Sequence, residues 1–520
     1  MKRALPLLHR PTALAIMAGL LILAAFPPLS LWPLAFLFLV PLLFALEGAS
    51  PSKAFWLAGL FAAVFFAGLL HWIVFNPAVE RWVRPLLYLG VVLIAAYLAL
   101  YFAAAAAAAR WIAARTRLPL WLVLPFCWTV AEYLRELGMM GFPWGAAGYA
   151  VTRFLPAIQM AELTGIHGVT FWVVLVNGLL FAEARHAWQL LRWPRPPRQD
   201  FFATLLGLVV VIAPVIGGQL RWTRVNERCA AAETVRVTLV QGNIEQGLRW
   251  DAEFQEQNWR TYDSLSRDAA RLSPRLVVWP ETALPFYLRY QERYLSMMRD
   301  LVDQTGAAVL TGVPDLSQDY VTNTTEYFNS SFLFAPHTGL VGQYAKAHLV
   351  PFGERFPLKE RIPGLREVNF GEGEWTPGTD TLPLRLGTVR FANLICFESI
   401  FPGIARTMAR RGAAFLTVIT NDGWFGRSGA ARQHADMAVL RAVETRRAVA
   451  RCANSGISQF IMPGGSVRQP TALYRQAVIT ADLPLLCGET FYVRHGDLFV
   501  LLVALLAAIA AAAAIVRPRT

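Results

Sequence analysis

The chain has 520 residues, of which 55% are hydrophobic and 16% charged, and its formal net charge is +13. This length allows more than one domain, and the apolar content excludes an ordinary soluble enzyme. The positive charge does not indicate nucleic-acid binding, because the arginines fall between hydrophobic runs and form no basic pattern interleaved with aromatic residues. We therefore expect a protein that lies largely in a membrane bilayer.

Eight hydrophobic runs come close to the ~20 residues that a helix needs to cross a bilayer. They lie at about 12–26, 31–46, 54–75, 85–109, 119–135, 168–184, 201–218 and 497–516, and the second and fifth are short. The basic start could belong to a signal peptide, but no small-residue cleavage site follows the first run. We expect an uncleaved first span, a membrane domain of seven helices at 1–220, and an eighth helix with a short tail at 491–520.

Basic residues between these runs are distributed unevenly. With the amino terminus in the cytoplasm, the short loops on the other side carry Arg81, Arg84, Arg135 and Arg153. The cytoplasmic side carries more, namely Lys53, Arg110, Arg115, Arg117, Arg185, Arg192, Arg195, Arg198, Arg517 and Arg519. This asymmetry follows the positive-inside rule. It predicts cytoplasmic termini and an exported segment at 221–490.

The connection at 136–167 contains a run of small and aromatic residues at 138–149. This composition suits a segment that dips into the membrane or lies on its face. A close-packed turn would have the same composition, so both alternatives stay open.

From residue 236 the hydrophobic periodicity changes. Strand patterns alternate with helical patterns: we expect strands at 235–243, 275–279, 307–313, 331–335, 388–395, 414–419, 457–462 and 472–481, and helices at 253–272, 291–305, 402–411 and about 430–451. Such alternation predicts a layered α/β domain.

One cysteine in this domain stands where a nucleophile could be held. Cys396 ends an apolar strand pattern, Glu398 comes two places later, and Pro402 opens a helical pattern. At a strand-to-helix turn, backbone N–H groups are available to receive an oxyanion. The plainer alternative is a buried structural cysteine, since free cysteine is among the most buried residue types.

Two further segments favour the catalytic alternative for Cys396. Glu281 follows a short apolar strand pattern, so its carboxylate would lie at a strand mouth, where burial can raise its pKa toward that of a general base. Lys346 is a single lysine among apolar and aromatic neighbours, and Glu354 follows shortly after it. The order Glu, Lys, Cys, each at the edge of a strand or turn, is a specific constellation.

With these residues, the segment 236–485 resembles the carbon–nitrogen hydrolase (nitrilase) superfamily, which uses a Glu-Lys-Cys triad. The whole chain is similar to the bacterial apolipoprotein N-acyltransferase family, membrane spans included. The resemblance is carried by WPET at 279–282, LVPFGE at 349–354, CFE at 396–398 and TNDGWFG at 420–426. Many relatives have a tyrosine after the nucleophile; this chain has Phe397, which lacks the hydroxyl but keeps the backbone N–H.

The resemblance implies an α-β-β-α sandwich exported to the periplasm from a multi-pass protein of the bacterial inner membrane. It also implies a ping-pong N-acyltransferase reaction, in which Glu281 is the base and Cys396 carries the acyl chain as a thioester. Lys346 and the backbone N–H of Phe397 would stabilise the oxyanion. The donor would be a phospholipid and the acceptor the amino group of the N-terminal diacylglyceryl-cysteine of an apolipoprotein. Neither a metal nor another cofactor is expected.

Other residues near these motifs have two interpretations. Glu354 and Glu398 could orient Lys346 or the turn around Cys396, or could form plain salt bridges beside the site. Aromatic residues could line the entrance for the acyl chain or act as interfacial anchors; the candidates are Trp250, Trp424 and Phe425.

Two histidines, His348 and His434, could suggest a Cys-His dyad, but the Glu and Lys segments explain more of the sequence, so we expect both histidines to be bystanders. The five cysteines show no zinc spacing. An exported domain could oxidise a pair of them, but the spacing gives no connectivity. Cys396 is expected to stay free.

Two other functions share parts of this pattern. A membrane-tethered amidase of the same superfamily would use the same three residues and release its product by hydrolysis. A transporter or scaffold would not need them. Sparse charge within the hydrophobic runs and the lack of an evident inverted repeat argue against transport.

Overall fold

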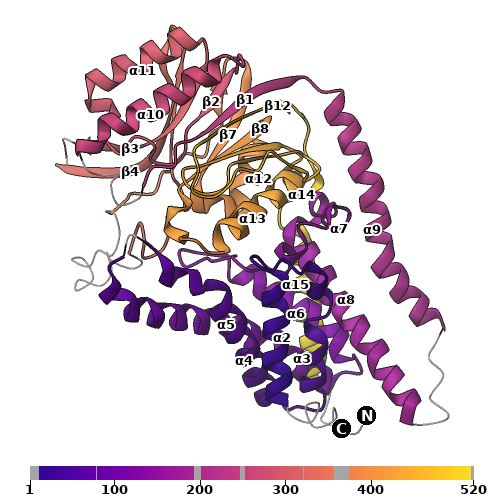
Figure 1. The fold of residues 1–520 in the computed structure, drawn as a ribbon. Helices are drawn as coiled ribbons and strands as arrows, with labels where there is room; N and C mark the ends of the chain where they lie inside the picture. Colours follow the sequence, from indigo (N-terminus) through magenta and orange to yellow (C-terminus); the bar gives the residue numbers. More distant parts are fainter. Residues whose placement is uncertain are drawn as a thin grey trace.

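The computed structural model describes residues 11–77, 79–192, 201–245, 252–319, 321, 323–356 and 374–516. Trp250 lies outside these residues. The described chain consists of a helical bundle and a domain with two β-sheets (Figure 1).

The bundle has a helix at each of the eight predicted hydrophobic runs. Leucine, alanine and phenylalanine dominate them, which suits helices in an apolar surrounding. The bounds are α2 (Pro11–Ala25), η1 (Trp32–Phe36) with α3 (Leu39–Leu46), α4 (Pro51–Leu70), α5 (Arg84–Arg115), α6 (Leu120–Leu134), α8 (Ala161–Arg192), α9 (Phe201–Ala230) and α15 (Leu498–Val516). Within the described residues, five stretches are long and apolar enough to cross a membrane: Pro51–Phe75, Arg84–Arg115, Ala161–Gln189, Gly207–Ala230 and Leu498–Val516.

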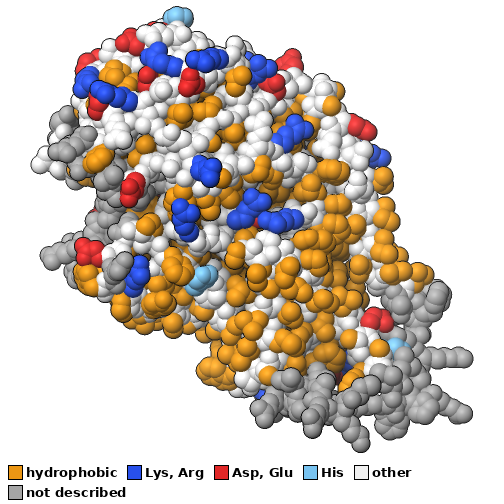
Figure 2. Space-filling model, in the orientation of Figure 1, with side chains coloured by type: hydrophobic (Ala, Val, Ile, Leu, Met, Phe, Trp, Pro, Cys, Tyr) orange, Lys and Arg blue, Asp and Glu red, His pale blue; other side chains and the backbone are white. Residues whose placement is uncertain are grey.

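Hydrophobic side chains cover the outside of this bundle, whereas charged side chains gather over the sheet domain (Figure 2). Leu93 of α5, Val209 of α9 and Leu505 of α15 are all more than half exposed. An apolar outer surface of this extent is what a helix bundle in contact with lipid requires.

The sheet domain is a sandwich of two six-stranded sheets. The first has the order β12-β1-β2-β3-β4-β5 and the second β11-β10-β9-β8-β7-β6. The first comprises β1 (Thr234–Gln241), β2 (Leu276–Val278), β3 (Ala308–Asp319), β4 (Thr324–Ala335), β5 (Gly339–Ala345) and β12 (Ala477–Pro484). The second comprises β6 (Leu384–Leu386), β7 (Val389–Ile395), β8 (Phe415–Thr420), β9 (Ala448–Ala453), β10 (Gln459–Ile461) and β11 (Val467–Arg468).

Helices cover the outer faces of both sheets. Helices α10 (Ala252–Ala270) and α11 (Glu292–Thr305) pack on the first sheet, and α12 (Pro402–Arg410) and α13 (Ala430–Thr445) pack on the second (Figure 1). Between the sheets, the Asn393 amide donates to the Ser331 hydroxyl at 2.8 Å. The predicted layered α/β domain is therefore confirmed as an α-β-β-α arrangement.

The helix predicted at about 430–451 is wrong in its last six residues. Helix α13 ends at Thr445, Arg446 adopts a left-handed φ of 52°, and residues 448–453 form the buried strand β9. The alanine and arginine content of this segment suits a helix. However, β9 pairs with β8 and β10, and a strand buried on both faces lacks the alternating pattern by which strands are recognised.

The bundle and the sandwich are joined by buried hydrogen bonds. Trp144 Nε1 donates to Gln433 Oε1 at 2.8 Å, and Tyr149 Oη donates to the carbonyl of Ile400 at 3.2 Å. Residues 143–151 are buried. Residues 143–149 form a close-packed turn between bundle and sandwich, whereas Met139 of the same run is 52% exposed.

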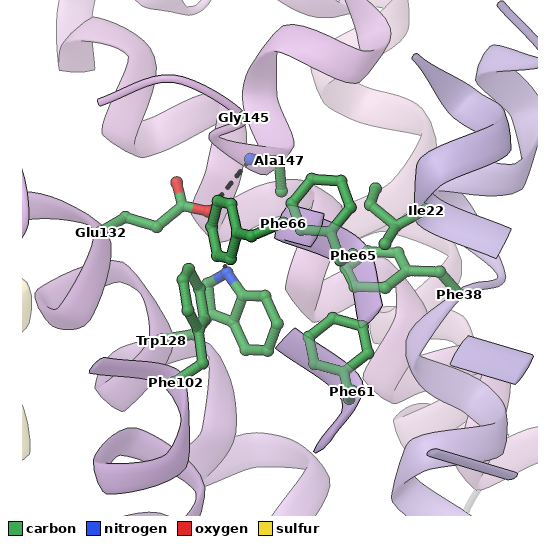
Figure 3. A pocket seen from close by; sticks show the side chains of 10 residues that line it. All are labelled: Ile22, Phe38, Phe61, Phe65, Phe66, Phe102, Trp128, Glu132, Gly145 and Ala147. Atoms are coloured by element: carbon green, nitrogen blue, oxygen red, sulfur yellow. Dashed lines mark hydrogen bonds between the residues drawn. The ribbon is translucent and has the colours of Figure 1, made fainter. Parts of the chain in front are cut away.

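A small cavity lies inside the bundle beneath this turn (Figure 3). Most of its lining is aromatic, and its carboxylate, Glu132, accepts hydrogen bonds from Trp128 Nε1, the backbone N of Ala147 and Thr170 Oγ1. The buried Glu132 carboxylate is thus satisfied by donors from the bundle and from the turn.

Candidate active site

The site lies where the carboxyl ends of parallel strands meet. Strands β1, β2 and β3 are parallel in the first sheet, and β7, β8 and β9 in the second. Glu281 follows β2 and Cys396 follows β7. The backbone N of Asn421, just after β8, donates to Glu281 Oε2 at 2.9 Å, so the two sets of strand ends are in direct contact.

Cys396 occupies a strained turn. Strand β7 ends at Ile395, and Cys396 opens the short helix η8 (Cys396–Ile400) with a φ of 52°. A non-glycine residue in this left-handed region costs about 1–3 kcal/mol and persists only where the surrounding structure holds it. Such strain is typical of a nucleophile at a strand-to-helix turn. The register of β7 and β8 places Cys396 beside Thr420.

Lys346 sits between two carboxylates. Its Nζ donates to Glu281 Oε1 at 3.2 Å and to Glu354 Oε1 at 2.8 Å, and the side chain is only 1% exposed. Asn329 Nδ2 donates to the same two oxygens at 2.9 and 3.0 Å. The ammonium and the amide thus hold the two carboxylates side by side, and the Glu-Lys pair predicted from the sequence is brought together.

The electrostatics of the site follow from this burial. Burial alone would lower the pKa of Lys346, but Glu281 and Glu354 outweigh it, so the pKa is raised and the side chain stays an ammonium. Burial raises the pKa of the Cys396 thiol and so does the charge of Glu281, whereas Lys346 lowers it. The net shift is upward, so the thiol is protonated at neutral pH.

Glu398 connects the turn around Cys396 to the segment that carries Lys346. Its Oε2 accepts the backbone N–H of Ile395 at 2.8 Å. Its Oε1 accepts the Tyr344 hydroxyl at 2.8 Å and the backbone N–H of Ala347 at 2.7 Å. The side chain is fully buried. Of the two interpretations of Glu398, the orienting one fits these contacts, since no cation is bonded to the carboxylate in this part of the structure.

The predicted aromatic residues differ in their surroundings. Phe425 is buried, with its ring centroid 4.7 Å from that of Trp72 and 5.8 Å from that of Trp144. Trp424 is only partly buried. The ring centroid of Phe397 lies 6.0 Å from that of Phe142 in the bundle. Phe425 and Phe397 thus contact the bundle.

Sequence reasoning missed several residues of the site. Asn329 lies inside β4, where a polar residue in a strand carries no particular signal. Asn421 acts through its backbone N–H, which no side-chain pattern reveals. Tyr344 lies two residues before Lys346, and the strand that contains it, β5, was not predicted.

His348 lies close to Lys346 but has the wrong charge for a Cys-His ion pair. Burial and the positive charge of Lys346 lower the pKa of His348 to about 4, so the imidazole is neutral at physiological pH. The centroid of its ring lies 3.9 Å from that of the Phe401 ring. All five cysteines are free thiols, Cys396 among them.

Comparison with known proteins assigns both parts of the chain. The family described as carbon–nitrogen hydrolase matches residues 236–489, and the one described as the apolipoprotein N-acyltransferase N-terminal domain matches residues 18–179. The first match contains Glu281, Lys346 and Cys396. Together with the two-sheet topology, it confirms the predicted nitrilase-like fold.

Relatives match along nearly the whole chain. The apolipoprotein N-acyltransferase of Geobacter metallireducens is 37% identical over 494 residues, which cover 94% of this chain and 92% of the relative. That of Chlorobaculum tepidum is 34% identical over 526 residues, which cover 95% and 94%. Among solved structures, a mutant amidase of the nitrilase superfamily from Nesterenkonia sp. AN1 is 17% identical, covers 51% of this chain and 94% of its own, and has a TM-score of 0.38.

Proposed function

The chain belongs to the apolipoprotein N-acyltransferase family, and from this membership and the geometry around Cys396 we propose the following function. The protein transfers a fatty acyl chain from a membrane phospholipid, through a thioester on Cys396, to the amino group of the N-terminal diacylglyceryl-cysteine of an apolipoprotein. The observation that carries this proposal is the buried contact of Lys346 with Glu281, at the strand ends where Cys396 also lies.

In the first half-reaction the thiol is protonated and needs a base, because its pKa is raised. Glu281 takes the proton as the sulfur attacks the ester carbonyl of the phospholipid. Lys346 and the backbone N–H of Phe397 stabilise the oxyanion, and losing one such donor typically costs about 3–4 kcal/mol of activation free energy. Glu281 then gives its proton to the departing lysophospholipid hydroxyl, which leaves the acyl thioester.

In the second half-reaction the amino group of the lipoprotein attacks the thioester. Glu281 takes a proton from the nitrogen and returns it to the sulfur as the C–S bond breaks, so the thiol is restored and an amide is formed. In the resting site its two carboxylate partners raise the pKa of Lys346, and Glu354 stays bound to its Nζ when Glu281 takes up a proton, so Lys346 stays positively charged through both halves. Its role is therefore electrostatic, and Glu281 carries the protons.

Glu354 is proposed to hold Lys346 in place rather than to react. Its Oε1 accepts from Lys346 Nζ, and its Oε2 accepts the backbone N–H of Val350 at 2.8 Å. Trp424 and Phe425 remain proposed contacts for the acyl chain.

The proposed location is the bacterial inner membrane, with both termini in the cytoplasm and the sandwich in the periplasm. The asymmetry of basic residues between the helices supports this orientation. Cys487 is an exposed thiol of the sandwich. A membrane-impermeant maleimide added to spheroplasts should therefore label wild type more strongly than Cys487→Ser; a difference that appears only after the membrane is opened would reverse the orientation.

The function is tested with phospholipid labelled in its acyl chain. Purified wild type should take up label without an acceptor and pass it to a diacylated lipopeptide as an amide, whereas Cys396→Ala should do neither. Cys487→Ser, which removes an exposed thiol elsewhere in the domain, should behave as wild type. Label released to water at the same rate with and without lipopeptide would indicate the hydrolase. Lipopeptide acylated by Cys396→Ala would exclude the thioester.

A further inference from the structure

A buried polar group lies behind Cys396 and has no part in the reaction described above. His434 of α13 places Nε2 at 3.2 Å from the carbonyl oxygen of Cys396 and at 3.0 Å from Ser399 Oγ. On the other side of the ring, Nδ1 lies 3.1 Å from Asp422 Oδ1. Arg451 Nη2 donates to Asp422 Oδ2 at 2.8 Å. His434, Asp422 and Arg451 are all at most 2% exposed.

The Cys396 carbonyl oxygen can only accept, so a hydrogen bond to it requires a proton on Nε2 of His434. With that proton in place, Nδ1 of a neutral ring accepts from Arg451 Nη2 at 3.2 Å, and Nδ1 of a charged ring donates to Asp422. Ser399 Oγ, the other neighbour of Nε2, donates to the same carbonyl oxygen at 2.8 Å. In the other neutral tautomer, Nδ1 donates to Asp422 and Nε2 accepts from Ser399 Oγ, which leaves the carbonyl without a donor from the ring.

Holding this carbonyl fixes the oxyanion donor on its other side. A trans peptide is planar, so the C=O of Cys396 and the N–H of Phe397 point in opposite directions from the same plane. The carbonyl is held toward the interior by His434 and Ser399. The N–H of Phe397 belongs to the first turn of η8, where backbone donors have no acceptor within the helix. It therefore points away from His434, on the opposite side of the peptide bond from the carbonyl.

We propose that His434 is a positioning residue that aims the Phe397 N–H at the oxyanion by holding the Cys396 carbonyl. The inference rests on the proposed function, because it concerns acyl transfer to Cys396. Asp422 and Arg451 hold the ring from behind, and the left-handed φ of Cys396 gives the peptide a conformation that needs such support. His434 does not act on the sulfur, so this is not a Cys-His dyad.

Two substitutions at His434 distinguish the contact made by Nε2 from the contact made by Nδ1. In His434→Gln the side-chain N–H reaches about as far as Nε2 and can still donate to the Cys396 carbonyl. In His434→Asn it reaches only as far as Nδ1, so the partner of Asp422 is kept and the donor to Cys396 is lost. A purely structural role would make both variants similarly defective.

The readout is the single-turnover rate at which phospholipid acylates Cys396, followed by intact mass. We expect His434→Asn to be slower by about 10–100-fold, the range for a misplaced oxyanion donor, with little change in the lipid concentration that gives half the maximal rate. His434→Gln should stay within about threefold of wild type, since a neutral donor is kept. Alkylation of Cys396 by iodoacetamide forms no oxyanion and should be unchanged in both variants.

Equal acylation rates for the two variants, or alkylation that falls together with acylation, would overturn the positioning role. If the asparagine variant does not fold, Ser399→Ala removes the other donor to the same carbonyl and should slow acylation about 2–10-fold at unchanged alkylation; an unchanged acylation rate would then overturn the proposal. Wild type that takes up no acyl chain would instead show that the proposed function itself is wrong.

Discussion

The carboxylate of Glu398 accepts a hydrogen bond from the backbone N–H of Ala347 at 2.7 Å. Glu398, two residues after Cys396, therefore holds the segment that carries Lys346. The same carboxylate accepts the N–H of Ile395, the last residue of β7. One buried side chain thereby fixes the strand that ends at the sulfur relative to the strand that ends at the ammonium. These strands, β7 and β5, belong to different sheets, so the carboxylate links the two sheets.

Removing this connection should affect stability and activity together. Glu398→Ala leaves the Tyr344 hydroxyl and the N–H groups of Ala347 and Ile395 buried without their acceptor, each at a cost of about 1–3 kcal/mol. We expect a loss of at least about 3 kcal/mol in the free energy of unfolding, and acylation below one hundredth of wild type. The matched control, Tyr344→Phe, removes a single hydroxyl and should cost only about 0.5–1.5 kcal/mol. Thermal unfolding in detergent compares the two; equal losses would contradict the connecting role.

The raised pKa of Glu398 also predicts that the stability of the protein depends on pH. Burial raises the pKa of Glu398 to about 7, whereas an unfolded chain has a Glu pKa of about 4.3. Between these values the folded state binds more protons than the unfolded state, so this group makes stability fall as pH rises, by at most about 1.4 kcal/mol per pH unit. Above about pH 7 its contribution is constant. Glu398→Gln does not titrate and should remove this slope in melting curves between pH 5 and 7; an unchanged slope would assign it to other groups.

The two charges beside Cys396 should act on the thiol in opposite directions. Glu281 raises its pKa and Lys346 lowers it. Glu281→Gln should therefore move the pH profile of iodoacetamide alkylation to lower pH, and Lys346→Met should move it to higher pH. Both variants should nevertheless lose acylation by about 10²–10³-fold, because one lacks the base and the other an oxyanion donor. Profiles that shift in the same direction would show that the two side chains do not both act on the sulfur.

The junction between bundle and sandwich offers a test that does not involve the site. Arg446 of the sandwich donates from Nε to Glu162 Oε2 of α8 at 2.7 Å, and Arg221 of α9 donates to Glu162 Oε1. Glu162→Gln leaves the buried Arg446 without a counter-charge and should cost about 3–5 kcal/mol. Arg221→Met removes a side chain that is 35% exposed and should cost at most about 1 kcal/mol. Limited proteolysis should separate bundle from sandwich more readily in the first variant only.

Glu281 and Cys396 each follow an apolar strand pattern in the sequence, whereas Lys346 was chosen as a single lysine among apolar and aromatic neighbours. Parallel strands bring their carboxyl ends to one edge, so residues far apart in the chain could be expected to meet. The eight helical segments were visible for a similar reason, since each coincides with an apolar run in the sequence, the shorter second and fifth runs included.

Features that depend on partners from elsewhere in the chain were not visible. Strand β9 was taken for the end of a helix, because its composition favours a helix and only its neighbours β8 and β10 make it a strand. His434 was expected to be a bystander, because the Glu and Lys segments explained more of the sequence; only the structure shows that it faces the carbonyl of Cys396, 38 residues away. Asn329 was overlooked, because its two carboxylate partners come from separate segments.

The most direct test of the thioester on Cys396 is the intact mass of the purified protein after exposure to phospholipid. We predict a mass increase equal to one acyl chain, located on Cys396, that neutral hydroxylamine removes and that a diacylated lipopeptide discharges. The same treatment should leave the mass of Cys396→Ala unchanged. A lipopeptide that becomes acylated while Cys396 never carries an acyl chain, even when the reaction is stopped by acid within its first turnover, would contradict the account.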